Sequence, residues 1–214
     1  NFIFNDLNIY NQIQPSSIDL TLSEECYEIK SSFLSPKMKL RKKLPNMIKR
    51  KIDLSKEKIF YKNRTYLVRL NEKLNLKNNI KGACNPKSSS GRLDIFCRTI
   101  LDYSDEYEKI PVNYSGEIFL EITSKSFDIV FKAGDSLNQM RLVYSENDYI
   151  SDELLYKLHK NQSVVFNNKN KKIKPYVDIG LKLSVDLSKK NKISAYKAKK
   201  KSPLLIFNKI RYHK

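Results

Sequence analysis

The sequence is poor in the residues that build disulfide frameworks and metal centres. Its 214 residues include three cysteines, Cys26, Cys84 and Cys97, and two histidines. The odd number of cysteines and their irregular spacing argue against a disulfide scaffold and fit a reducing cytoplasm. Cys84 and Cys97 are also too isolated along the chain to complete a four-ligand zinc site.

Long apolar runs and leader-like patterns are missing as well. No stretch approaches the roughly 20 apolar residues of a membrane-spanning helix, and no signal-peptide pattern opens the chain. Position 1 is Asn rather than Met, which indicates a chain that is processed, trimmed or a fragment. We therefore expect a cytoplasmic protein that has no membrane partner.

Acidic residues are scarce in the last quarter of the chain. The net charge is +18, but residues 1–156 carry 24 Lys and Arg against 21 Asp and Glu, whereas residues 157–214 carry 17 against 2. Lys supplies 33 of the 41 basic residues, while a nucleic-acid footprint is usually richer in Arg and interleaved with aromatics. We favour an AT-rich coding bias over a nucleic-acid partner as the source of this charge.

The hydrophobic pattern predicts a mainly β protein. Apolar and polar residues alternate, as in half-buried strands, over residues 18–22, 65–70, 118–122 and 127–131. Short strands separated by polar turns are typical of a sandwich or barrel. The best helix signal covers residues 151–159, with Ser151 as N-cap, and a shorter helix is expected near the start. We interpret the basic segment 37–51 as an exposed loop, with a short amphipathic segment as the alternative.

Two segments carry a chemical signal. Residues 85–93 (NPKSSSGRL) gather a Lys, an Arg and three hydroxyls around a glycine, a composition that suits phosphate oxygens. The alternative is a polar loop in which Ser89 or Ser90 caps a short helix over residues 91–97; a helix N-terminus would itself favour phosphate. Residues 114–121 (YSGEIFLE) place Glu121 at the end of an apolar strand. Together they indicate nucleotide chemistry.

Both segments resemble motifs of the dCTP deaminase/dUTPase family. Residues 14–22 (QPSSIDLTL) resemble its N-terminal motif, and residues 133–140 (AGDSLNQM) resemble its late Gly-x-x-x-x-Gln strand. The four motifs occur in the family's order, and the long, internally duplicated bacterial dCTP deaminases look most similar. The resemblance implies a mainly β, dUTPase-like β-clip, which is a distorted barrel with a few short helices.

The resemblance also implies roles for individual residues. Glu121 would be catalytic, because deamination needs a group that takes a proton from water and returns it to the ring nitrogen and the departing ammonia. An ordinary strand Glu is the alternative. Lys87, Ser88, Ser89 and Arg92 would bind the triphosphate, with Arg92 also catalytic through orienting the water or the reacting carbon.

Three further residues match family positions. Tyr114 would pack on the sugar and exclude a 2′-hydroxyl; a core or hairpin tyrosine is the alternative. Gln139 would lie near the triphosphate or the base. Asp19 is interpreted as a residue of the core or of a subunit contact.

The expected activity is conversion of dCTP to dUTP and ammonia without zinc, since the His-x-Glu and Pro-Cys-x-x-Cys patterns of zinc deaminases are missing. Magnesium would arrive with the triphosphate of dCTP or another deoxynucleoside triphosphate. The family is commonly homotrimeric, so we expect a homo-oligomer.

Two alternatives remain open. The first is a dUTP pyrophosphatase or a bifunctional enzyme, although Pro111 stands where dUTPases carry the Asp that prepares water; Asp102 is a candidate substitute. The second is an inactive, truncated paralogue.

The C-terminal part predicts an internal repeat. Residues 180–187 (GLKLSVDL) resemble residues 15–20 (PSSIDL) in their Ser-x-Asp-Leu ending. We therefore expect a deaminase-like domain over residues 1–160, a basic linker over 161–175, and the start of an incomplete second repeat over 176–214.

Overall fold

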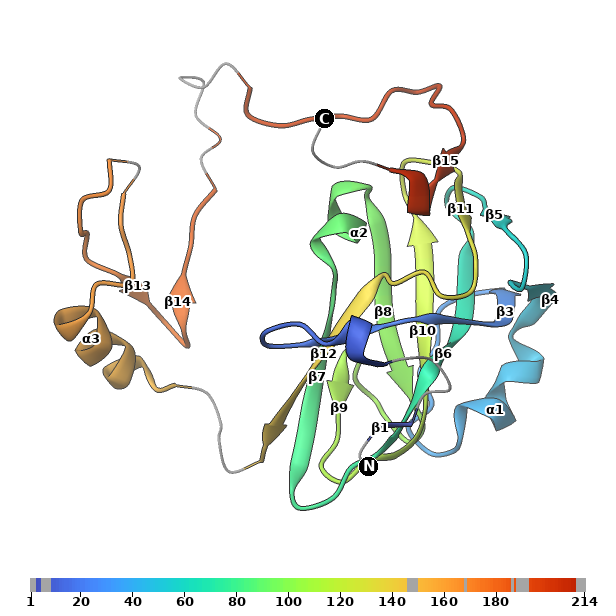
Figure 1. Ribbon diagram of the computed structural model, residues 1–214, viewed down its shortest axis with the longest axis horizontal. Coiled ribbons are helices and arrows are strands. Elements are labelled where there is room, and N and C mark those ends of the chain that lie inside the picture. The colour runs from blue at the N-terminus through green and yellow to red at the C-terminus, as the bar shows by residue number, and fades with distance from the viewer. Residues whose placement is uncertain are drawn as a thin grey trace. The chain divides into compact units, whose positions relative to one another are not determined.

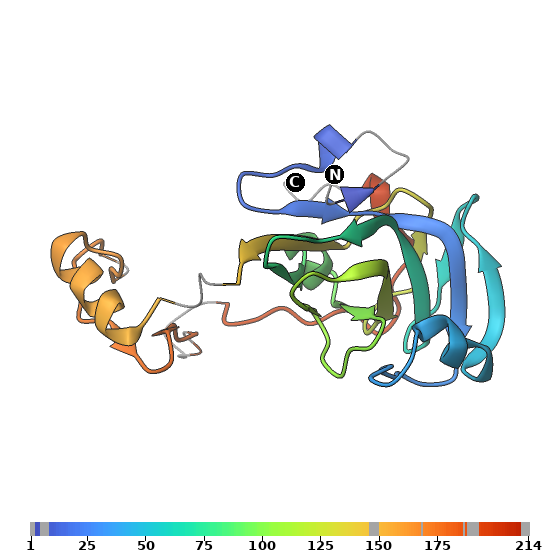
Figure 2. The ribbon, with the colours of Figure 1, turned by 90° about the horizontal axis from the view of Figure 1, so that it is seen from below.

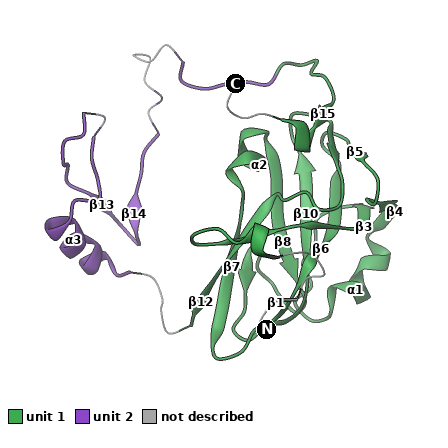
Figure 3. Cartoon of the chain, viewed as in Figure 1, with its two compact units in different colours: residues 1–145, 199–214 green, residues 146–198 purple. Residues whose placement is uncertain are grey.

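The computed structural model describes residues 3–4, 9–145, 150–167, 169–185, 187 and 193–210. The chain forms two compact units, one made of residues 1–145 and 199–214 and the other of residues 146–198 (Figure 3). Within the described ranges, no helix is long and apolar enough to cross a lipid bilayer.

The first unit is built mainly from three β-sheets (Figure 1). The first sheet has the strand order β4 (Ile48–Asp53), β3 (Leu22–Ile29), β6 (Thr65–Asn75), β10 (Ser115–Ser124) and β8 (Ile95–Leu101), and β1 (Ile3–Phe4) also pairs with β6. The second sheet has the order β2 (Ile18–Leu20), β12 (Asn138–Tyr144), β7 (Ile80–Pro86) and β9 (Lys109–Ile110). The third has the order β15 (Leu205–Ile206), β11 (Ile129–Phe131) and β5 (Lys58–Phe60).

Short helical segments connect these strands. They are η1 (Ile9–Gln12), α1 (Leu40–Lys43), η2 (Leu44–Asn46), α2 (Ser88–Arg92) and η3 (Phe207–Lys209). Figure 2 shows α1 and η1 at opposite sides of this unit. The fold is thus mainly β with a few short helices, as the sequence predicts.

Strand alternation divides the core of the first unit into two clusters. On β6 and β10, the residues Tyr66, Val68, Ile118, Leu120 and Ile122 belong to the larger cluster, and all are fully buried. Leu67 and Phe119 point the other way, into a smaller cluster with Phe33, Leu40 and Leu44. Each fully buried side chain of this kind contributes about 1.5–3 kcal/mol. Since side chains alternate, Glu121 shares the face of Phe119.

Most of the expected strands are confirmed. Residues 65–70 lie in β6 and residues 118–122 in β10. The expected strand over 18–22 is divided between β2 and β3, and the one over 127–131 begins only at Ile129. A helix over residues 91–97 is wrong: α2 ends at Arg92, and residues from Ile95 onward pair with β10 as β8.

The loop expected over residues 37–51 is also wrong. This segment forms α1, η2 and the start of β4. Leu40 and Leu44 lie four residues apart and are almost fully buried, so they anchor one face of the segment to the sheet. Pro45 lies in the first turn of η2, where its missing N–H leaves no helical hydrogen bond unmade.

The second unit contains α3 (Asp152–Asn161) and the hairpin of β13 (Tyr176–Val177) and β14 (Leu181–Lys182). Ser151 caps α3 as expected, because its hydroxyl accepts a hydrogen bond from the Leu154 N–H at 3.2 Å. The Asp152 carboxylate accepts hydrogen bonds from the N–H groups of Ile179 and Gly180, which ties the hairpin turn to the helix.

The compact units divide the chain differently from the expected boundaries at 160 and 175. The first unit ends at residue 145, and residues 199–210 return to it, where β15 pairs in parallel with β11 and Phe207 packs on Phe131. The repeat hypothesis for residues 176–214 stays a prediction, and Asp186 in its pattern lies outside the described residues. The short helix expected at the start corresponds to η1; residues 1–2 and 5–8 are not described.

Candidate active site

The serine-rich segment forms α2, which connects β7 of the second sheet to β8 of the first. Ser90 is fully buried, and its hydroxyl donates a hydrogen bond to the Leu137 carbonyl at 2.8 Å. Ser88 and Arg92 are exposed, and Ser89 is half-buried. Ser90 therefore anchors the segment, and the residues expected to bind phosphate are those that water can reach.

Lys87, which directly precedes α2, forms an ion pair with Asp19 on β2. Asp19 lies opposite Gln139 in the β2–β12 register, and the Ser17 hydroxyl donates a hydrogen bond to Gln139 Oε1 at 3.2 Å. We call Ser17, Asp19, Lys87 and Gln139, together with α2, the phosphate-loop group. The structure thus brings Lys87 and Gln139 together through Asp19.

Glu121 lies on β10 of the first sheet, directly opposite Arg98 on β8. Its side chain is 2% exposed, and its Oε1 atom forms an ion pair with Arg98 Nε at 2.9 Å. The other oxygen, Oε2, is buried and has no hydrogen-bond partner. Glu121 is therefore not an ordinary outward-facing strand residue.

Two further side chains hold Arg98. Its guanidinium stacks over the Tyr107 ring at 3.6 Å, and Nη2 donates a hydrogen bond to the Ser32 hydroxyl at 2.7 Å. The Ser32 and Tyr107 hydroxyls are also hydrogen-bonded to each other at 2.7 Å. We call Ser32, Arg98, Tyr107 and Glu121 the carboxylate group. Sequence reasoning missed its first three members, because cross-strand register and loop contacts leave no signal in a single sequence.

Tyr114 is only 8% exposed and folds back over its own hairpin. Its hydroxyl donates a hydrogen bond to the Glu117 carbonyl at 2.7 Å and accepts one from the Asp102 N–H at 3.3 Å. A Cβ atom on Gly116 would lie 2.6 Å from this hydroxyl, so the motif needs glycine there. The geometry is that of the hairpin tyrosine considered above, and a contact with the sugar stays a prediction.

Glu108 connects the strands that carry the two groups. Its carboxylate accepts hydrogen bonds from the Thr99 N–H at 2.5 Å and from Asn138 Nδ2 at 3.3 Å. Burial raises the pKa of this carboxyl. Thr99 follows Arg98 on β8, and Asn138 precedes Gln139 on β12, so Glu108 fixes the distance between these strands.

The structure does not join the two groups directly. The carboxylate group is built on the first sheet, and Lys87, Asp19 and Gln139 are held by the second. Among the described residues, no hydrogen bond or ion pair links Glu121 to residues 87–92. A substrate that touches both groups would therefore have to reach residues of two different sheets.

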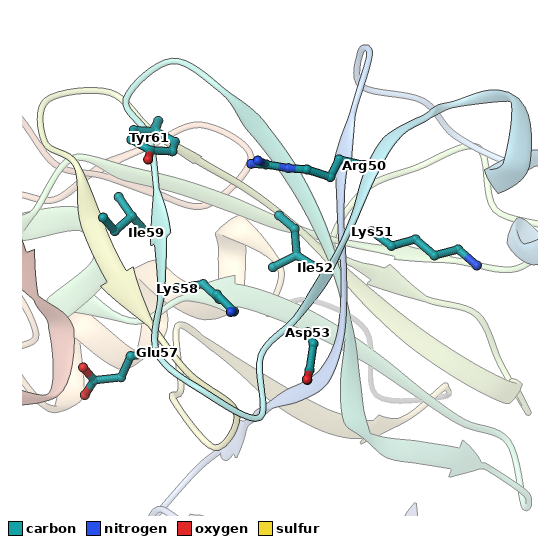
Figure 4. A pocket seen from close by; sticks show the side chains of 8 residues that line it. All are labelled: Arg50, Lys51, Ile52, Asp53, Glu57, Lys58, Ile59 and Tyr61. Atoms are coloured by element: carbon teal, nitrogen blue, oxygen red, sulfur yellow. The ribbon is translucent and has the colours of Figure 1, made fainter.

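A separate cavity of about 430 Å³ lies between β4 and β5. Figure 4 shows its lining, which includes Arg50, Ile52, Lys58 and Tyr61. None of the expected site residues lines it, so it is not the candidate active site. No group of three or more His, Cys, Asp or Glu side chains in the described ranges is arranged to hold a metal ion.

Comparisons with known proteins identify a matching family and a similar solved structure. Residues 4–146 match the family described as the 2′-deoxycytidine 5′-triphosphate deaminase (DCD) N-terminal domain. The structure of 2′-deoxycytidine 5′-triphosphate deaminase from Agrobacterium tumefaciens is similar at a TM-score of 0.85 and 31% identity over 99% of this chain. This chain spans 63% of the length of that protein.

A second solved structure, the native EIAV dUTPase, has a TM-score of 0.35 and 16% identity, covering 47% of this chain and 78% of that one. That likeness is too distant to support an argument. No curated protein matches the chain. The family match covers most of the first compact unit, including every residue of both groups. This chain therefore belongs to the dCTP deaminase N-terminal domain family.

Proposed function

We propose that this protein is a dCTP deaminase that hydrolyses dCTP to dUTP and ammonia without zinc. The observation that carries the proposal is Glu121, a buried carboxylate with one oxygen paired to Arg98 and the other without a partner. A free carboxylate oxygen in apolar surroundings suits a group that accepts a proton and gives it back.

The chemistry follows from that arrangement. Glu121 removes a proton from a water molecule, and the resulting hydroxide attacks C4 of the cytosine ring. The carboxyl then returns the proton to the ring nitrogen N3. It next transfers the proton of the new C4 hydroxyl to the amino group, so that ammonia leaves as the C4–N bond breaks and the C4 carbonyl forms. The same group therefore acts first as base and then as acid.

Substrate binding is assigned to the phosphate-loop group. Ser88, Ser89 and Arg92 are accessible to water and would contact the triphosphate, which brings Mg²⁺ with it. Lys87 and Gln139 lie beside them, and Tyr114 shapes the hairpin expected to receive the sugar and the base. The deoxynucleotide substrate and the three free, buried cysteines both fit a cytoplasmic enzyme.

In a homo-oligomer, the carboxylate group of one chain and the phosphate-loop group of a neighbouring chain would form one site. We propose that Glu121 of one chain faces α2 of a neighbouring chain, as the family's common trimeric assembly implies. The placement of the two groups on different sheets supports this arrangement.

The dUTP pyrophosphatase alternative finds no support in the hairpin. Pro111 has no carboxylate to activate water. One carboxylate oxygen of the nearby Asp102 accepts a hydrogen bond from the Leu40 N–H at 2.7 Å and so caps α1. Glu108 is engaged by Thr99 and Asn138.

The test compares ammonia release from dCTP by the unchanged protein, Glu121→Gln and the control Glu117→Gln. Glu117 lies on the same strand and is also paired with an arginine, Arg41. We expect Glu121→Gln to reduce kcat about 100- to 10,000-fold while dCTP binding persists, and Glu117→Gln to retain activity. Unchanged turnover by Glu121→Gln would remove Glu121 from the mechanism.

A further inference from the structure

Arginine–glutamate pairs on or beside the first sheet differ in how the arginine uses its nitrogens. Arg41 binds both oxygens of Glu25, with Nη1 on Oε1 at 2.8 Å and Nη2 on Oε2 at 2.9 Å. Arg98 donates only Nε to Glu121 and directs Nη2 to Ser32.

Arg69 resembles Arg98 in this respect, since it donates only Nε to Glu25 and directs Nη1 to the Leu70 carbonyl. A guanidinium can bind a carboxylate through two parallel hydrogen bonds, and here it makes a single one where another acceptor takes one of its terminal nitrogens.

We propose that Arg98 is a positioning residue that fixes Glu121 with Oε2 free for proton transfer, and that Ser32 and Tyr107 keep Arg98 in this one-bond geometry. The inference rests on the proposed function and assigns a role to three residues that the motifs do not contain.

The first observation is the burial of Glu121. Glu121 is 2% exposed and shares its sheet face with Phe119, whose cluster also contains Phe33 and Ile100. A charged carboxylate in such surroundings needs a partner, and Arg98 is the one hydrogen-bonding partner that the described residues give it. Without Arg98, the carboxylate would lose both its counter-charge and its fixed orientation.

The second observation is that Ser32 and Tyr107, which we call the clamp, both contact Arg98. The Ser32 hydroxyl holds Nη2, the Tyr107 ring lies 3.6 Å from the guanidinium carbon, and the two hydroxyls bind each other. Ser32 comes from the segment after β3, and Tyr107 comes from the segment between β8 and β9. Tyr107 also precedes Glu108, whose carboxylate is bound to the Thr99 N–H. The clamp is therefore anchored to β8 next to Arg98 itself.

The clamp also prevents a second hydrogen bond between Arg98 and Glu121. If Nη2 were released from Ser32, Arg98 could close on Glu121 with two bonds, as Arg41 does on Glu25. Oε2 would then be occupied and could no longer accept a proton from water. The observed geometry instead gives that nitrogen to Ser32.

The kinetic test uses three variants and one control in the full chain. Arg98→Gln should reduce kcat for dCTP about 100-fold with KM within about threefold, since loss of orientation costs rate more than binding. Arg98→Lys should restore part of that loss. Ser32→Ala should reduce kcat about tenfold at unchanged KM, although it leaves the ion pair intact. The control Arg41→Gln, which breaks the two-bond pair, should leave kcat unchanged.

A second readout does not depend on turnover. Carbodiimide with glycinamide labels accessible carboxylates, and mass spectrometry locates the label. We expect Glu121 to be protected in the unchanged protein and labelled in Arg98→Gln, with thermal melting showing that the variant is folded. If the unchanged protein does not turn over dCTP, the proposed function fails, and labelling still decides whether Arg98 holds Glu121.

The kinetic and labelling results distinguish the proposed role of Arg98 from the proposed function. Reduced kcat in both Arg98→Gln and Ser32→Ala, with normal kcat in Arg41→Gln, supports the inference. Equal kcat in the unchanged protein and Arg98→Gln would overturn it while leaving the proposed function intact. Equal labelling of Glu121 in those two proteins would overturn it as well.

Discussion

The carboxylate group and the phosphate-loop group place charge in opposite surroundings. Glu121 is 2% exposed, and every contact that holds it is made across strands or by clamped loops. The residues of the phosphate-loop group that would meet the triphosphate are exposed or half-buried, and Lys87 remains 27% exposed even when paired with Asp19. The chain thus buries the carboxylate that we propose for proton transfer and leaves the residues that we propose to bind phosphate accessible to water.

This difference in burial suits the roles that we propose for the two groups. Proton transfer benefits from a low dielectric and a fixed geometry, because both strengthen the interaction with developing charge. Triphosphate binding needs ligands that can exchange water for phosphate, and long side chains at the surface do this at lower desolvation cost. We therefore expect changes in the carboxylate group to alter kcat and changes in the phosphate-loop group to alter KM.

The largest effect outside the carboxylate group is expected for Arg92→Gln. Loss of a charged hydrogen-bond donor to phosphate should raise KM for dCTP about 10- to 100-fold. Steady-state kinetics would show this with kcat reduced less than KM is raised. An effect on kcat alone would instead assign Arg92 to the chemical step. It would then contradict the expectation that changes in the phosphate-loop group alter KM.

Gly116→Ala tests the hairpin that carries Tyr114. The new Cβ would meet the Tyr114 hydroxyl at 2.6 Å and displace the ring, at an expected cost of about 1–3 kcal/mol in the free energy of unfolding. Gly91→Ala is the matched control, because nothing lies within 4 Å of its Cβ position in α2. Urea denaturation should show Gly116→Ala less stable and Gly91→Ala as stable as the unchanged protein or more so.

Asp19→Asn should affect binding more than catalysis. The change removes the partner of Lys87, so the Lys87 side chain becomes less ordered beside α2. We expect KM for dCTP to rise by several-fold, roughly 1 kcal/mol in binding, with kcat nearly constant. A fall in kcat alone would show that Asp19 serves the carboxylate group instead.

The smallest effect concerns a pair outside both groups. Burial tends to raise the pKa of the Glu25 carboxyl, but hydrogen bonds from Arg41 and Tyr27 and the Arg41 charge outweigh it and lower the pKa from 4.5 to about 2. Glu25 therefore stabilises the fold above pH 4.5, and this contribution is lost as the pH falls toward 2.

Glu25→Gln should accordingly lower the free energy of unfolding by about 1 kcal/mol at neutral pH, a modest value because Arg41 is 45% exposed. Urea denaturation between pH 7 and pH 2 would show the difference from the unchanged protein shrinking with acid. A constant difference over this range would contradict the role given to the Glu25 charge.

The parts of the fold that depend on local pattern could be predicted from the sequence. Alternation over residues 65–70 and 118–122 is a property of each strand alone, and it places Glu121 on a strand. The catalytic role of Glu121 was implied by the resemblance to the family and not by the strand pattern. The prediction of an exposed loop over residues 37–51 gave more weight to the many lysines than to Leu40 and Leu44. Tertiary packing buries both leucines.

The partners of the site residues depend on contacts that are distant in sequence. Lys87 meets Asp19 across 68 residues, and Arg98 meets Ser32 across 66. Such pairs are set by strand register and by the loops between strands, which a single sequence does not specify. The carboxylate was therefore predictable, whereas the arginine that orients it was not.

The most direct test of the central claim is the product formed from dCTP and Mg²⁺ by the unchanged protein, with CTP and dUTP as parallel substrates. Chromatography and an ammonia assay should show dUTP and ammonia from dCTP, with CTP and dUTP unchanged. Formation of dUMP, or no product from dCTP in a folded protein, would contradict the account.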